Sequence, residues 1–308
     1  MSIIATVKSK KVVDYKKQRQ REKNITIITF TCIPLVLLIL FSFIPLGSMF
    51  YYGLTSWNGT APNKEFVGFQ NYVTIFTKPE YFEVFKVSIY YFVGSFVQLA
   101  LALYFATILT SGVRYQNLFK GFLFFPYLIN GVAIGFIFLY CLKQGGTLDI
   151  ILTKIGLGSL IQKWLGNAKI INYSMAGVSI WRYMGNNLIM FIGAIQSISD
   201  EIYEAAELDG ASRWQQFKYI IMPSIKRIVQ LNLLLAINGA LAVFEIPYVM
   251  LQGANGSKTF VIQTIETAFQ FKKVGLGSAM GIVLLMIVVV IAIIQNVFFK
   301  EEEAEMYD

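Results

Sequence analysis

The sequence predicts an all-α integral membrane protein with six transmembrane helices. Of its 308 residues, 56% are hydrophobic and only 14% are charged, and the hydrophobic residues gather in long runs. A run of about 20 apolar residues crosses the ~30 Å hydrocarbon core as a helix, because each backbone polar group must then be bonded within its own segment. A soluble protein of this length is not expected to have such a composition.

Four of the predicted spans carry no charged residue: 25–50, 87–113, 121–142 and 274–299. The other two, 174–197 and 228–250, each contain one ionisable side chain, Arg182 and Glu245 respectively. A charge at mid-span is unfavourable in lipid, so we expect both side chains to face protein or water, where they could also face each other.

The distribution of basic residues predicts the orientation of these spans. The first 24 residues contain eight lysines and arginines, whereas the loop that follows, to about residue 83, contains only Lys64 and Lys78. Basic residues resist translocation, so residues 1–24 should form a basic cytoplasmic tail. Residues 25–300 then form the six-span transmembrane domain. The acidic tail 301–308 returns to the cytoplasm, and the loops 51–83, 143–173 and 251–273 lie outside.

The composition also excludes several functions. Much of the net charge of +8 sits beside the first span, which indicates a topology signal and contact with anionic lipid, and we predict no nucleic-acid partner. The chain contains no histidine, which excludes histidine-dependent catalysis and histidine metal sites. We expect no catalytic residue, metal site or cofactor in this chain. Cys32 and Cys141 fall within spans and are interpreted as small buried apolar side chains.

A polar segment, 198–226, separates the two spans that contain a charge. Residues 201–208 are good helix formers, Asp200 can cap the first turn, and Gly210 can end the helix in a left-handed conformation. Pro223 should then punctuate the chain before the next span. We therefore expect a short helix on the cytoplasmic membrane face.

This segment resembles the EAA loop of bacterial ABC-importer permeases, whose pattern is E-A-A, three residues, G, nine residues, I, one residue, L, P. Only Met222 departs from the pattern, in place of leucine. The resemblance implies a type I ABC-importer permease fold with a cytoplasmic coupling helix. The residues that it places in contact with the ATPase are Glu204, Ala205, Ala206, Asp209, Gly210, Ile220 and Pro223.

Shorter stretches resemble the carbohydrate-uptake branch of these permeases, which includes the membrane subunits of the maltose importer. They begin at Phe66, Phe124, Ser179, Gly193 and Phe244 and occur in the order of that branch, from about residue 30 to 298. The family's Gly-Gly-Pro after the fifth span is replaced here by residues 253–255, which leaves the geometry of that loop open. Two glycine pairs, 131/135 and 277/281, are spaced for close helix packing.

By resemblance, the spans on either side of the EAA loop line the sugar path. On the earlier span, the distance from the loop indicates Arg182, Tyr183 and Asn186, with Asn187 pointing about 100° away. On the later span, three- and four-residue steps place further candidates along one helix face: Asn238, Leu241, Ala242, Glu245 and Tyr248. Amides, aromatic rings and one or two charges suit sugar hydroxyls and ring faces. The alternative is that these residues join helices, with Arg182 and Glu245 as a structural ion pair.

The resemblance implies a permease subunit that imports a sugar or oligosaccharide through a bacterial cytoplasmic (inner) membrane. Its partners would be a second homologous permease, two ABC ATPases that use ATP and Mg²⁺, and an extracellular solute-binding protein. Two alternatives remain open. One is an ABC permease for an amino acid, peptide or polyol, and the other is a secondary transporter with Glu245 as its proton site.

Overall fold

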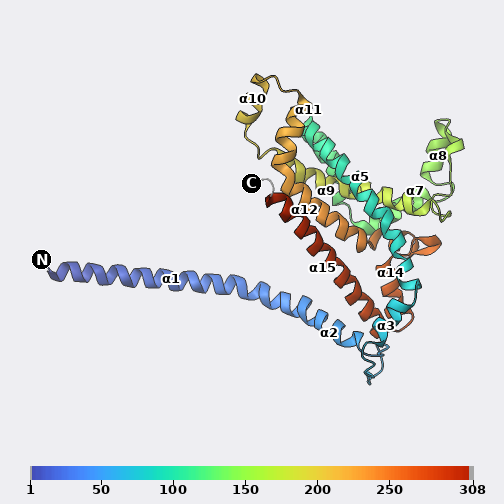
Figure 1. Ribbon diagram of the computed structural model, residues 1–308, viewed down its shortest axis with the longest axis horizontal. Helices are drawn as coiled ribbons and strands as arrows, with labels where there is room; N and C mark the ends of the chain where they lie inside the picture. The colour runs from blue at the N-terminus through green and yellow to red at the C-terminus, as the bar shows by residue number, and fades with distance from the viewer. Residues whose placement is uncertain (1, 305–308) are drawn as a thin grey trace.

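The computed structural model describes residues 2–304, and these residues form an almost entirely helical chain (Figure 1). Within them, extended pairing is limited to one antiparallel bridge between Thr55 and Phe66. The main helices are α1 (Ser2–Leu38), α2 (Ile44–Gly53), α5 (Phe85–Thr110), α6 (Gln116–Leu128), α7 (Gly131–Leu142), α9 (Ile171–Ile195), α12 (Met222–Leu241), α13 (Glu245–Leu251) and α15 (Val274–Ala304).

Shorter elements connect these helices. The short α-helices are α3 (Gln70–Thr77), α4 (Glu80–Glu83), α8 (Thr147–Lys154), α10 (Asp200–Leu208), α11 (Arg213–Gln216) and α14 (Phe260–Ile265). The π-helical segments are η1 (Ile39–Phe43), η3 (Phe217–Ile221) and η5 (Glu266–Gln270), and the 3₁₀ turns are η2 (Gly158–Leu160) and η4 (Ala254–Gly256).

Within residues 2–304, four helices are long and apolar enough to cross a membrane, and a bent pair of helices makes up to five. The bent pair is α6 and α7, which meet at 95°. It corresponds to the predicted span 121–142, so that span is not one continuous helix. The predicted span 174–197 coincides with α9, a helix of 25 residues that is not among these candidates, because its polar side chains make it less apolar.

The helical bundle is centred on α5 and α9, which pack along each other, with α6 and α12 against them. Leu188 and Phe191 of α9 are fully buried in the apolar core between these helices, together with Ala102 and Ala106 of α5. The small side chains on α5 allow α9 to approach closely. Gly185 of α9 has the same role toward α6, since a Cβ there would lie 2.5 Å from the carbonyl oxygen of Leu123.

Helix α1 extends away from this bundle, and α2 connects it to α15 (Figure 1). The candidate span 18–53 buries none of its most apolar window against the described chain. The interpretation of Cys32 as buried is therefore wrong: its side chain is exposed, because no other described helix covers this part of α1. Cys141 is half-buried.

Two predicted spans are interrupted near the middle of the fold. After α6, Pro126 precedes a break at residues 129–130, and the side chain of Asn130 then caps α7 by accepting a hydrogen bond from the Val132 amide (2.9 Å). The predicted span 228–250 breaks at residues 242–244, between α12 and α13. Side chains before and after such a break no longer share one helix face.

Proline at two positions follows a π-helical segment without ending the helix. Pro45 lies in the first turn of α2, directly after η1, and Pro223 lies in the first turn of α12, directly after η3. Proline lacks an N–H but is tolerated in a first turn, and here the wider π register precedes it. The expectation that Pro223 punctuates the chain is therefore wrong, because helical structure continues from α11 to the end of α12.

The segment 251–273, expected as a loop, contains the buried helix α14. Phe260 is fully buried in an apolar cluster with residues of α15, and Ile262 is fully buried as well. A second contact joins this segment to 143–173, where the Asn255 amide donates to the carbonyl oxygen of Leu165 (3.0 Å).

Both glycine pairs lie at close helix contacts, as predicted. A Cβ on Gly135 would lie 2.5 Å from the Val249 side chain of α13, and one on Gly281 would lie 2.5 Å from the end of Met49. A Cβ on Gly277 would lie 2.6 Å from the Cβ and 3.0 Å from the Cα of Ala268. These atoms cannot move away by a change of rotamer, as the end of a flexible side chain can.

We expect Gly277→Ala to destabilise the fold by about 1–3 kcal/mol, because the added methyl overpacks the contact between α15 and η5. Thermal unfolding of the detergent-purified protein measures this change. The matched control is Gly193→Ala on α9, where a Cβ meets nothing within 4 Å and alanine favours the helix. Equal stability of the two variants would contradict the packing role of Gly277.

Candidate functional site

Helix α10 lies at the end of the bundle opposite α3 (Figure 1), and it contains the Glu204-Ala205-Ala206 motif. The helix ends as the sequence predicts, since Gly210 is left-handed with φ of +78°. The Gly210 amide donates to the carbonyl of Glu207 (3.0 Å), and the Ala211 amide donates to that of Ala206 (2.9 Å). These two bonds form a Schellman motif, which fixes the end of the helix.

The start of α10 differs from the prediction. Ser199, not Asp200, occupies the N-cap position, and its side chain makes no capping hydrogen bond. Asp200 is instead the first helical residue, where its negative charge still favours the helix N-terminus. Side-chain capping occurs at the next helix, α11, where Ser212 and Gln215 form a reciprocal capping box.

The outer surface of α10 is open. Glu204 and Ala205 are exposed, and Ala206 is half-buried. Leu208 is 90% exposed, which is high for a leucine at the end of an ordered helix. We did not predict Leu208 as a site residue, although a leucine between two acidic residues in a polar loop was the available signal.

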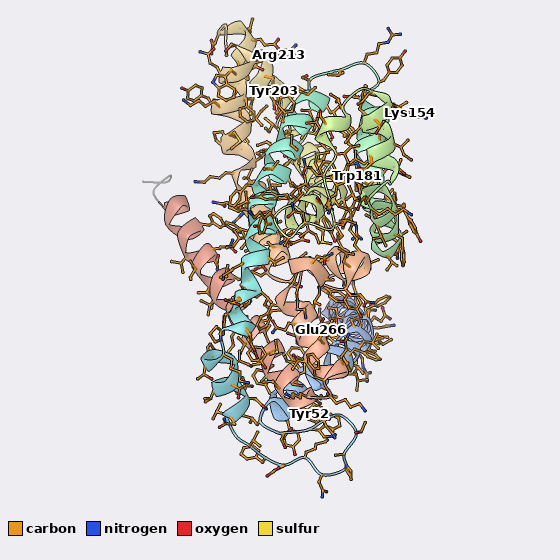
Figure 2. The ribbon with its side chains drawn as sticks, turned by 90° about the vertical axis from the view of Figure 1, so that its right-hand side faces the viewer. Tyr52, Lys154, Trp181, Tyr203, Arg213 and Glu266 are labelled. Atoms are coloured by element: carbon orange, nitrogen blue, oxygen red, sulfur yellow. The ribbon has the colours of Figure 1, made fainter. Side chains whose placement is uncertain are left out.

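A cleft of about 1020 Å³ lies behind α10, between this helix, α11 and the ends of α5 and α9. Tyr203 and Arg213 line it and lie together at this end of the molecule (Figure 2). Burial and the nearby Asp200 carboxylate raise the pKa of Tyr203 above its ordinary value, so its hydroxyl stays protonated. Of the three other predicted coupling residues, Asp209 is the C-cap of α10, Ile220 lies in η3 and Pro223 lies in the first turn of α12.

A second cavity, of about 480 Å³, lies within the bundle on the helices that flank α10. Its polar lining consists of hydroxyl groups, amides and one carboxylate. These are Tyr91, Ser95 and Gln98 of α5, Tyr127 of α6, Ser179, Tyr183, Asn186 and Asn187 of α9, and Glu245 of α13. A cavity with this lining can bind a polar, uncharged molecule through several hydrogen bonds.

Arg182 and Glu245 form an ion pair at the edge of this cavity, with Arg182 Nη1 at 2.5 Å from Glu245 Oε2. The same nitrogen lies 3.2 Å from the hydroxyl of Tyr183, and the guanidinium lies 4.9 Å from the centre of its ring. The expectation that the two charges face protein, and can face each other, is confirmed.

A chain of amides joins three helices beside the cavity. Gln98 of α5 donates to Asn187 of α9 (2.7 Å), and Asn187 donates to Asn232 of α12 (2.6 Å). Asn232 in turn donates to the carbonyl of Ile228 (2.8 Å). All three side chains are buried, so each depends on its neighbour for hydrogen bonding.

The predicted path residues are only partly brought together. Tyr183, Asn186, Ala242 and Glu245 line the cavity, and Arg182 reaches it through its ion pair. Asn238 and Leu241 are not in its lining, because they lie on another side of α12 from Leu235, Ala236, Gly239 and Ala240, which line it. Tyr248 is not in the lining either, and it lies beyond the break at 242–244. Sequence reasoning missed Tyr91, Ser95, Gln98 and Asn187, although polar residues in otherwise apolar spans were a usable signal.

Comparisons with known proteins match most of the chain. Residues 98–301 match the family model described as "Binding-protein-dependent transport system inner membrane component". The chain is similar to the "Probable ABC transporter permease protein YurN" of Bacillus subtilis (strain 168), with 32% identity over 89% of this chain and 96% of that protein. It is also similar to the "Arabinooligosaccharides transport system permease protein AraP" of the same strain, with 30% identity over 85% of this chain and 84% of that protein.

The fold resembles a chain in the crystal structure of a bacterial ABC transporter involved in the import of the acidic polysaccharide alginate. The TM-score is 0.79 at 19% identity, covering 93% of this chain and 99% of that one. A second structure of a bacterial alginate ABC transporter, in complex with an alginate pentasaccharide-bound periplasmic protein, gives 0.77 at 18% identity, covering 90% and 95%. At these identities the likeness establishes the fold.

We expect Asn187→Leu to destabilise the protein by about 1–3 kcal/mol, because it leaves the Gln98 amide and the Asn232 carbonyl oxygen buried without their partner. Thermal unfolding in detergent measures the loss. Replacing Gln98, Asn187 and Asn232 together by leucine leaves no unpaired amide, so this triple variant should be at least as stable as the single one. An Asn187→Leu protein as stable as the parent would contradict a bonded amide chain.

Proposed function

This chain belongs to the family of binding-protein-dependent transport system inner membrane components, and on that premise we propose that it imports a sugar or oligosaccharide as one permease subunit of an ABC importer. We infer the substrate class from the cavity of about 480 Å³, which is lined by hydroxyls and amides. Such groups complement the many hydroxyls of a sugar, and the rings of Tyr127 and Tyr183 offer apolar faces. The name of the AraP relative, which specifies arabinooligosaccharides, supports the same class.

We assign coupling to the residues predicted on and after α10: Glu204, Ala205, Ala206, Asp209, Gly210, Ile220 and Pro223. The exposed motif and the Schellman end make α10 a rigid, accessible helix. To these residues we add Leu208, because an exposed apolar side chain at the end of α10 is suited to a groove on a partner. We assign ATP and Mg²⁺ binding to two ATPase subunits, not to this chain.

The proposed topology has six spans in a bacterial cytoplasmic membrane, with both chain ends and α10 on the cytoplasmic side. Length and composition give five candidate spans, and we propose α9 as the sixth. It carries polar side chains of the cavity and packs against both α5 and α6. A second permease subunit would complete the translocation path, and an extracellular binding protein would deliver the sugar. The basic residues before the first span would contact anionic lipid.

The geometry gives no support to the proton-coupled alternative. The carboxylate of Glu245 is held by Arg182 at 2.5 Å, which is the arrangement of a structural ion pair, the other role that the sequence left open for this residue. We therefore expect transport to depend on ATP hydrolysis by partner subunits.

The first test is affinity purification of the protein from its native host in mild detergent, followed by reconstitution into liposomes. We expect a second permease and an ABC ATPase to co-purify, and we expect sugar uptake that requires ATP and resists a proton ionophore. Purification of this chain alone, with uptake abolished by the ionophore, would favour the secondary transporter.

The coupling role predicts that Gly210→Pro and Ala206→Glu each abolish uptake while the protein still inserts into the membrane. Proline has no N–H for the bond to Glu207 and cannot adopt the positive φ of this position, and the added carboxylate disturbs the surface offered to the ATPase. Membrane content by immunoblot and uptake of labelled sugar separate the two effects. Gln20→Glu, which adds the same charge on exposed α1, is the control and should transport normally, whereas normal uptake by both α10 variants would exclude the coupling role.

A further inference from the structure

The negative charge that this chain places in the cavity lining is paired with a positive charge of the same chain. Among the described residues that line the cavity, Glu245 is the only one with a formal charge. Its partner Arg182 is nearly buried, with 11% of its side chain exposed, compared with 37% for Glu245. The carboxylate therefore lies between the arginine and the cavity.

The ion pair is also enclosed from the side of α7. Gly131, the first residue of α7, lies so close that a Cβ there would overlap both the Glu245 carboxylate and the Arg182 guanidinium. The Tyr183 ring covers a further face of the guanidinium at 4.9 Å. Because Glu245 lines the cavity and Arg182 does not, a ligand carboxylate in the cavity lies closer to Glu245 than to Arg182.

From this geometry we infer that the site accepts uncharged sugars and rejects uronic acids, and that Glu245 is the residue that determines this preference. The inference rests on the proposed function of the cavity. A uronate carboxylate near Arg182 would meet the like charge of Glu245 in surroundings of low dielectric constant, which is unfavourable. The fold itself does not decide the matter, since a solved transporter of this fold imports the acidic polysaccharide alginate.

Uncharged hydrogen-bonding groups remain available for such a sugar. Within the described residues, the hydroxyls of Tyr91 and Ser179 are buried without a hydrogen-bond partner, and both residues line the cavity. A hydroxyl can both donate and accept, which matches a sugar hydroxyl in either role. The free groups therefore suit a neutral ligand, while the one charged group is already paired.

The test uses the assembled complex in detergent, without its binding protein, and measures binding by isothermal titration calorimetry. The probes are neutral hexose oligosaccharides, namely malto- and cello-oligosaccharides, and the same molecules oxidised at C6 to uronates. We expect the parent to bind a neutral oligosaccharide at least about tenfold more tightly than its uronate, because like charges at a binding site oppose each other. Glu245→Gln, which leaves Arg182 positive and unpaired, should strengthen uronate binding by about tenfold or more.

A second variant covers the possibility that Glu245→Gln does not assemble. Asn186→Lys leaves the ion pair intact and adds an unpaired positive charge to the cavity lining, so it too should strengthen uronate binding. Glu83→Gln removes an exposed carboxylate outside the cavity and should leave both affinities unchanged.

The outcomes separate the inference from the function on which it rests. A parent complex that binds a neutral oligosaccharide and its uronate equally would overturn the inference alone. Unchanged uronate binding in both Glu245→Gln and Asn186→Lys would do the same. A complex that binds neither probe but transports an amino acid or peptide would overturn the proposed function, and the inference with it.

Discussion

The ion pair between Arg182 and Glu245 holds together the part of the fold that encloses the cavity. Helix α7 starts at Gly131 and α13 starts at Glu245, so both interrupted spans resume beside the arginine of α9. Breaking a buried pair by removing one partner costs about 3–5 kcal/mol, less where a partner is as exposed as Glu245, because a buried charge is left alone. Glu245 also occupies the first position of its helix, where the helix dipole favours a negative charge.

The two breaks explain why a polar cavity can exist in so apolar a chain. In lipid, a backbone outside a helix is tolerated only where protein or a cavity satisfies its polar groups. At the first break the side chain of Asn130 accepts a hydrogen bond from a backbone amide of α7. At the second, residues 242–244 themselves line the cavity. The chain departs from helical geometry at the place where polar groups are needed.

The sequence is most informative where a local rule decides the structure. Gly210 ends α10 with a positive φ, as a local rule predicts. The cost of a charge in an apolar span likewise predicts a partner for each charge, and Arg182 and Glu245 form an ion pair. It is least informative where long-range packing decides. Asn238 and Leu241 lie on a side of α12 that does not line the cavity, and Tyr248 lies beyond a break that no local pattern predicted. Asn187 was placed away from the path by helix geometry, yet it lines the cavity because partners on α5 and α12 surround it.

In the proposed importer, force applied to α10 has two direct routes to the cavity. One runs back along α9, which carries Asn187, and the other runs through α11 and η3 into α12, which carries Asn232. The amide chain from Gln98 through these two asparagines ties both routes to α5, so the three helices should move together. The breaks at 129–130 and 242–244 are then the points where the chain can bend, with α13 held to α9 by the ion pair and α7 packed against α13. Movement of α10 would therefore change the cavity by bending the chain at its breaks rather than by separating the helices that bear its polar lining.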